Sequence, residues 1–211
     1  MKSNHIKDII FVAGPPGSGK TTVSEEYERW HPDANQFGTG KLLDKISSDE
    51  INSKHVNILK VAKEKNILLP PEIFSEIVYE KVKNTDNDIN SILITGFPHA
   101  SEDWRHFERA AKSGTVRLLG VVALLACEVT CVERMAKRDI QLGRDTNEID
   151  PFEKYASYSD RYCRLMGGYA SRLTLYEQSG LSIIKISAED NLEAVYDHFD
   201  NSVSKLKKGR S

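Results

Sequence analysis

The chain has 211 residues, of which 39% are hydrophobic and 28% are charged. This balance excludes fibrous and disordered classes, and the length allows one α/β domain with insertions but not two. With 29 basic and 31 acidic residues the net charge is −2, so nothing electrostatic favours nucleic acid or an anionic membrane. The longest apolar run is about half the roughly 20 residues that a membrane helix needs. We expect a cytoplasmic monomer whose partner is a small molecule.

Short aliphatic and β-branched runs alternate along the chain with segments of helical periodicity. The predicted strands cover 9–13, 35–37, 92–95, 116–126 and 181–187. The predicted helices cover 20–30, 39–47, 52–65, 71–83, 101–112, 128–138, 152–179 and 189–206. Strands with little alternation are typical of a parallel sheet covered by helices on both faces. The pattern predicts a doubly wound α/β domain that binds ligands at the carboxyl ends of its strands.

A phosphate-binding loop is predicted directly after the first strand. The stretch GPPGSGKTT fits G-x-x-x-x-G-K-[ST] and leads into a helix, which is the context that this motif requires. Glycines let successive N–H groups point at phosphate oxygens, and the helix N-terminus adds its partial positive charge. The lysine supplies a cation and the threonine hydroxyl a Mg²⁺ ligand. The expected nucleotide-binding residues are Gly14, Gly17, Ser18, Gly19, Lys20, Thr21 and Thr22.

The loop leaves the reaction open, because kinases, GTPases and motor ATPases all use it. Taken with FGTGKLLDKI, LLPPEIFSEIVYEKV, ILITGFPHA, CVERMAKR and LYEQSG, it resembles the nucleoside monophosphate kinases, adenylate kinase most closely. The motifs follow the family order from about residue 8 to residue 200. The resemblance implies a single P-loop NTPase domain over 1–211 with a five-stranded parallel sheet, an acceptor-binding helical insertion at about 38–84 and a short lid at about 139–160. It also implies ATP with Mg²⁺ as the donor.

On the donor side the resemblance assigns four arginines. Arg134 would stack on the donor adenine, and Arg138, on the same helix face, would meet phosphate. Arg144 corresponds to the lid arginine that clamps the transferred phosphate, and Arg161 to a phosphate-binding arginine at the exit of the lid. Phosphoryl transfer needs such cations because charge spreads over the equatorial oxygens in the transition state. The expected catalytic set is Lys20, Arg138, Arg144 and Arg161.

On the acceptor side the chain departs from the family at four positions. Asp44 and His99 stand where the family has arginines on the acceptor phosphate. Thr95 replaces an aspartate that holds Mg²⁺ through water, and Asp103 replaces a glutamine that reads the adenine edge. The resemblance further implies that Thr39, Gly96 and Phe97 contact the acceptor, and Thr21 and Thr95 remain the expected metal residues.

These departures leave several acceptors open. Replacing arginine by aspartate beside a dianionic phosphate exchanges attraction for repulsion. Either a nucleoside monophosphate binds in a rearranged pocket that uses His99, Lys41 and Lys45, or the acceptor is a hydroxyl compound without phosphate that Asp44 or Asp103 holds. A third hypothesis is a nucleotide-binding regulator that has lost catalysis. We expect a nucleotide-like acceptor.

Overall fold

The computed structural model describes residues 6–48, 50–51, 53–65, 67–112, 114–143 and 151–209, except for the side chains at 151 and 152. Its strands are β1 (Lys7–Ala13), β2 (Ala34–Gly38), β3 (Ser91–Thr95), β4 (Val116–Leu125) and β5 (Ile183–Ser187). They form one five-stranded parallel sheet in the order β2-β3-β1-β4-β5. Strand β2 pairs with β3 from Ala34 opposite Ser91 to Gly38 opposite Thr95. Strand β4 pairs with β5 from Val121 opposite Ile183 to Leu125 opposite Ser187. The predicted fold class is confirmed.

The helices lie close to the ranges that periodicity predicts. They are α1 (Lys20–Trp30), α2 (Thr39–Ser47), α3 (Val56–Glu64), α4 (Pro71–Lys83), α5 (Ser101–Ala111), α6 (Glu128–Gln141), α7 (Pro151–Gln178) and α8 (Leu192–Lys208). The last one starts three residues later than predicted because Asn191 is its N-cap, accepting a 2.9 Å hydrogen bond from the backbone N–H of Ala194. Across the described ranges no helix is both long enough and apolar enough to cross a membrane.

The chain divides into two compact units, and the boundaries fall within β1, α1 and β4. The first unit comprises Met1–Phe11 and Glu28–Leu119. Its core is an aromatic cluster in which Phe11 packs against Trp104 and Phe107 with ring centroids 5.4 and 6.1 Å apart. Phe97 joins the cluster 5.0 Å from Phe107. Within this unit α4 packs against α5 and α2 against α3.

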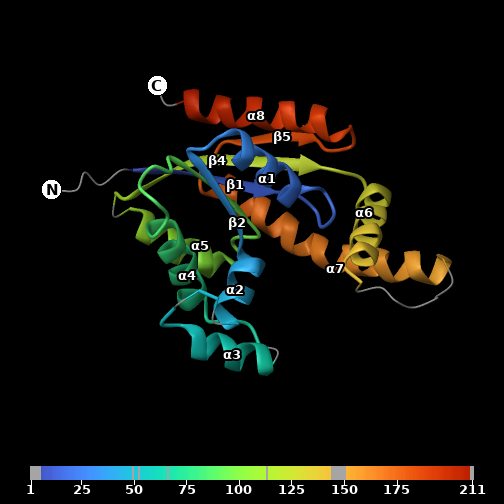
Figure 1. Cartoon of the computed structure of the whole chain (residues 1–211), viewed down its shortest axis with the longest axis horizontal. Coiled ribbons are helices and arrows are strands. Elements are labelled where there is room, and N and C mark those ends of the chain that lie inside the picture. Colours follow the sequence, from blue (N-terminus) through green and yellow to red (C-terminus); the bar gives the residue numbers. More distant parts are fainter. Residues whose placement is uncertain are drawn as a thin grey trace. The chain divides into compact units, whose positions relative to one another are not determined.

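The second unit comprises Val12–Tyr27 and Gly120–Ser211. Helix α8 lies along β5 (Figure 1), and the ring of Phe199 meets Tyr27 edge-on at 5.9 Å. Helices α6 and α7 pack against each other, with Cys131, Met135 and Tyr162 buried between them. The phosphate-binding loop and the predicted donor arginines all belong to this unit, whereas the predicted acceptor residues belong to the first.

Candidate active site

The loop between β1 and α1 has the backbone that a phosphate cradle needs. Gly17 and Gly19 have φ angles of 84° and 90°, in the left-handed region that costs free energy for residues with a Cβ. A Cβ at Gly17 would also lie 2.3 Å from the carbonyl oxygen of Cys131, at the start of α6. Only glycine therefore fits this turn of the loop.

The polar groups of the loop are suited to binding an anion. The hydroxyl oxygen of Ser18 is buried and has no hydrogen-bond partner, a state that costs about 1–3 kcal/mol. The Nζ of Lys20 donates to the carbonyl oxygens of Gly14 and Pro15 at 3.0 and 2.7 Å. Thr21 and Thr22 are exposed in the first turn of α1. A bound phosphate would satisfy the Ser18 hydroxyl and offer Lys20 a charged partner, so these residues fit the nucleotide that the motif implies.

Lys20 lies near two arginine side chains that affect its pKa. Burial lowers the pKa of Lys20 to about 8, and repulsion from the guanidinium groups of Arg172 and Arg138 adds to this effect. Burial also lowers the pKa of Arg172 itself, which lies on α7 beside Tyr169 and Tyr176. Grouping positive charges in a partly buried place is unfavourable without an anion. The arrangement is therefore suited to a polyphosphate.

A buried carboxylate brings two predicted arginines together. Asp139 on α6 accepts a 2.8 Å hydrogen bond from Nη1 of Arg161 on α7, and Nε of Arg138 lies 3.5 Å from its other oxygen. Burial would raise the pKa of Asp139, but the hydrogen bond and charge of Arg161, with the charge of Arg138, hold it below its usual range. Asp139 thus fixes the spacing of Arg138 and Arg161 across the α6–α7 pair. Arg144, the predicted lid arginine, lies outside the described residues.

A cavity of about 200 Å³ adjoins the cradle in the same unit. It is lined by Ser18, Gly19 and Thr22, by Arg134, and by Asp190 and Leu192 after β5. A guanidinium at one wall can stack on a flat aromatic ligand. This is where Arg134 could meet the base of a nucleotide whose phosphates lie in the loop.

In the first unit, the ends of β2 and β3 form the base of the predicted acceptor site. The hydroxyl of Thr39, the first residue of α2, donates to the carbonyl oxygen of Gly96 at 2.9 Å. Gly96 has φ of 79°, and a Cβ there would lie 2.8 Å from that hydroxyl. Thr95 is buried at the end of β3, with its hydroxyl 2.9 Å from the place a Cβ on Gly38 would take. The Thr39 hydroxyl and the turn at Gly96 are thus locked together.

A cavity of about 530 Å³ lies beside this turn. Three of the predicted acceptor residues line it, namely Asp44, His99 and Asp103, whereas Lys41 and Lys45 do not. The remaining wall is mostly apolar, with Leu43, Leu59, Ile67, Leu69 and Phe74 among its residues. The ring of His99 stacks on Phe74 at 4.4 Å, and Phe74 in turn packs on Phe97 at 5.5 Å. Phe97 is therefore buried behind the wall and supports it.

The two acidic residues of this cavity differ in availability. Oδ2 of Asp103 accepts hydrogen bonds from the backbone N–H groups of His99 and Ala100 at 2.9 and 2.8 Å, so that it closes the first turn of α5. The carboxylate of Asp44 is exposed and pairs with Nζ of Lys63 on α3, 3.2 Å away. Lys63 also donates to the hydroxyl of Ser47 at 3.4 Å. The ammonium group of Lys63 thus lies beside Asp44, the residue that replaces a family arginine.

Sequence reasoning missed Arg172, Asp139 and Lys63. Arg172 follows Arg161 by 11 residues, close to three helical turns, so their common helix face could have indicated it. Asp139 directly follows Arg138, which could have drawn attention to it, but its pairing with Arg161 gave no signal in the sequence. Lys63 gave none, because its pairing with Asp44 depends on how α3 packs against α2.

Comparison with known proteins gives the same result as the loop and the arginines. The sequence model of a family described as AAA domain matches residues 13–153. An adenylate kinase of Wolinella succinogenes is 30% identical over 67% of this chain and 73% of its own length. The adenylate kinase of Campylobacter lari is 26% identical over 96% of this chain and all of its own length. Human adenylate kinase isoenzyme 1 is 27% identical over 94% of this chain and 95% of its own length. The chain belongs to the adenylate kinase-like family of P-loop nucleoside monophosphate kinases.

Proposed function

We propose that the protein transfers the γ-phosphate of ATP to a nucleoside monophosphate or a related nucleotide. The observation that carries the proposal is the phosphate-binding loop with its cations, in which Arg172 and Arg138 are close enough to Lys20 to help lower its pKa. A loose phosphoryl-transfer transition state needs positioning and positive charge rather than a protein nucleophile. Partly buried cations act strongly there because little water screens them.

On the donor side, the loop N–H groups and Lys20 hold the phosphates. The unpaired hydroxyl of Ser18 donates a hydrogen bond to a phosphate oxygen, and Arg134 stacks on the base in the neighbouring cavity. Arg138 and Arg161, spaced by Asp139, approach the transferred group. Mg²⁺ would neutralise phosphate charge, and we propose the hydroxyl of Thr21 as its ligand in the second unit. Thr95, in the first unit, stays a prediction as a residue that meets the metal through water. Arg144 is proposed as a further clamp on the transferred phosphate.

On the acceptor side, the 530 Å³ cavity has room for a nucleoside, and its apolar wall suits a base. Thr39, Gly96 and Phe97 support this wall and the turn beneath it. Lys63 provides positive charge for the acceptor phosphate, and the imidazole of His99 offers it a hydrogen bond, in place of the two arginines of the family. Asp44 weakens that charge because it already pairs with Lys63.

A second candidate acceptor is a hydroxyl compound without phosphate. The specific observation in its favour is the same Asp44–Lys63 pair, which leaves that part of the cavity rim close to neutral. In this reaction Asp44 would hold the hydroxyl or accept its proton. The chain would remain an ATP-dependent phosphotransferase, with a different acceptor.

The test is transfer from γ-labelled ATP to a panel of nucleoside monophosphates, nucleosides and small hydroxyl metabolites. We expect label in a nucleoside diphosphate. Label in a nucleoside or hydroxyl compound instead supports the second candidate, and ATP binding with no transfer to any member supports a regulator. Lys20→Ala should reduce transfer by roughly a thousandfold, with Lys205→Ala, an exposed lysine of α8, as the control. Unchanged transfer in Lys20→Ala overturns the assignment of the donor site.

A further inference from the structure

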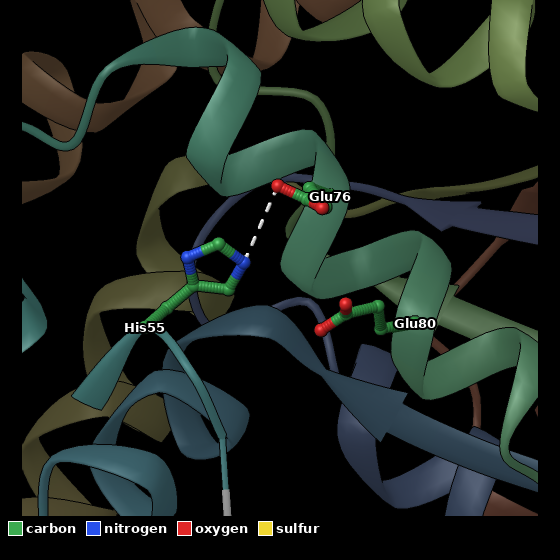
Figure 2. Close-up of side chains that lie close together, drawn as sticks. All are labelled: His55, Glu76 and Glu80. Carbon is green, nitrogen blue, oxygen red and sulfur yellow. Dashed lines mark ion pairs between the residues drawn. The ribbon is translucent and has the colours of Figure 1, made fainter.

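Three potential metal ligands converge in the first unit, away from the residues assigned above. His55 immediately precedes α3, and Glu76 and Glu80 lie one turn apart on α4, so that both carboxylates share a helix face. Figure 2 shows the imidazole and the carboxylates pointing toward one another. One ligand atom of each residue lies within 4.8 Å of the other two. Nε2 of His55 is 3.3 Å from Oε2 of Glu76.

The imidazole is placed as a ligand would be. His55 is only 7% exposed, and its buried Nε2 has no hydrogen-bond partner, because the approach to Glu76 lacks hydrogen-bond geometry. The side chain does not cap α3 either, although His55 occupies the N-cap position. A buried polar nitrogen in this state is destabilising, and an electron-pair acceptor between it and the carboxylates would remove the cost.

We propose that His55, Glu76 and Glu80 form a binding site for a divalent transition-metal ion of the Zn²⁺ type. Zinc takes histidine nitrogen and carboxylate oxygen at about 2.0–2.2 Å in a tetrahedron, so neighbouring ligand atoms lie about 3.3 Å apart. The distance from His55 to Glu76 matches this spacing, and Glu80 completes the set with a small side-chain adjustment. Water fills the fourth position. A nitrogen ligand disfavours Mg²⁺ and Ca²⁺, which select oxygen.

Lys54 is the competitor for this site. Its ammonium group donates to Glu76 and lies 3.1 Å from a carboxylate oxygen of Glu80. The ammonium group thus lies between the two carboxylates, where the metal ion would bind. The side chain of Lys54 is 57% exposed and can turn into solvent. The metal therefore displaces the lysine from the carboxylates and gains the His55 nitrogen, which the lysine cannot use.

Metal binding would tie the start of α3 to the middle of α4. The cavity-lining residues Leu59 and Lys63 lie on α3, and Phe74 lies on α4. The site thus has a structural role in the first unit, and the inference does not rest on the proposed phosphotransferase activity. Because a ligand that binds only the folded state stabilises it, Zn²⁺ should raise the melting temperature.

The test uses the full chain, stripped of metal with a chelator and titrated with Zn²⁺ without nucleotide. We expect Glu80→Gln and His55→Asn each to weaken binding by roughly tenfold or more, because each removes a ligand. Lys54→Met should tighten binding by about tenfold, because it removes a like charge from the site. His106→Gln is the matched control, since His106 pairs with Glu72 at 3.2 Å but belongs to no three-ligand group among the described residues.

A second readout keeps the proposal open to contradiction if a variant folds poorly. Cys127 and Cys163 are exposed and are the competing ligands for the ion. Co²⁺ in place of Zn²⁺ should show d–d absorption but not the near-ultraviolet band of a thiolate complex. A thiolate band overturns the assignment. Equal affinity of the parent chain, Glu80→Gln and Lys54→Met also overturns it.

Discussion

The proposed donor site and the proposed acceptor site differ in the charge of the residues that form them. In the second unit, the phosphate-binding loop, the unpaired hydroxyl of Ser18 and the cations around Lys20 form a polar site suited to an anion. In the first unit, the corresponding cavity is mostly apolar, and the carboxylate of Asp44 pairs with Lys63 near its rim. The donor side keeps a large excess of positive charge, and the acceptor side does not.

This contrast separates two properties that a kinase can change independently. Charge on the donor side stabilises the transition state and affects turnover with every acceptor. Charge on the acceptor side affects which molecule is bound. Substitutions in the second unit should therefore lower kcat for all acceptors, whereas substitutions in the first unit should change their relative KM values.

Arg172→Ala is expected to give the largest effect and tests the donor half of the contrast. Because this guanidinium adds positive charge near Lys20, where the phosphates would lie, its removal should lower kcat by roughly a hundredfold or more. Arg164→Ala, an exposed arginine on the same helix, is the control. Steady-state kinetics with saturating ATP gives the comparison. An unchanged kcat with normal melting would mean that Arg172 serves only packing beside Tyr176.

Asp139→Asn should have a smaller effect, because Asp139 positions arginines and does not itself meet substrate. Loss of its charge frees Arg161 and Arg138, and we expect kcat to fall by roughly tenfold. The distinguishing measurement is a double-mutant cycle with Arg161→Ala. If the carboxylate acts through Arg161, the two effects combine to much less than their sum. Additive losses would contradict the positioning role.

Asp44→Arg tests the acceptor half by restoring the residue that the family has there. Removing a negative charge and adding a guanidinium should lower KM for a nucleoside monophosphate by about tenfold. For a nucleoside without phosphate the KM should not fall. Asp44→Asn separates the two contributions, since it releases Lys63 without adding a cation. Equal changes for both acceptors would show that Asp44 does not discriminate by charge.

The sequence predicted those features that rest on local patterns. Strand order along the chain, the glycine loop and the arginine pair on α6 follow from short-range spacing, and the observed elements agree within a few residues. The start of α8 was predicted at residue 189, three residues too early, because Asn191 supplies the cap. The partners of buried charges were not predictable. Asp139 with Arg161, and Asp44 with Lys63, are 22 and 19 residues apart and meet only after helices pack.

The same limit applies to the acceptor cavity. Asp103 stands where the family reads a base, but its Oδ2 accepts two backbone N–H groups at the start of α5. A first-turn acid is also what the helix dipole favours. The sequence alone supported both interpretations. The hydrogen bonds of Oδ2 show the structural role, and base recognition by Asp103, which also lines the cavity, stays a prediction. Lys41 and Lys45 were likewise reasonable substitutes for the lost arginines, and the structure adds that neither lines the cavity.

The smallest expected effect is a fraction of a proton, and it reports directly on the charge of the donor site. With its pKa lowered to about 8, Lys20 is partly neutral at pH 8.5 before nucleotide binds. Bound phosphates favour the charged form and raise this pKa, so ATP binding at pH 8.5 should take up about half a proton or more. At pH 6.5 the lysine is already protonated in both states, and this contribution should vanish.

Calorimetry of MgATP binding in two buffers of different ionisation enthalpy measures the uptake, and Lys20→Met should abolish it. Because the free enzyme must gain a proton, affinity for ATP should fall as the pH rises above 8. An affinity that does not change from pH 7 to pH 9.5, with no proton uptake, would mean that the cations around Lys20 leave its charge intact and that the donor site is less crowded than its geometry indicates.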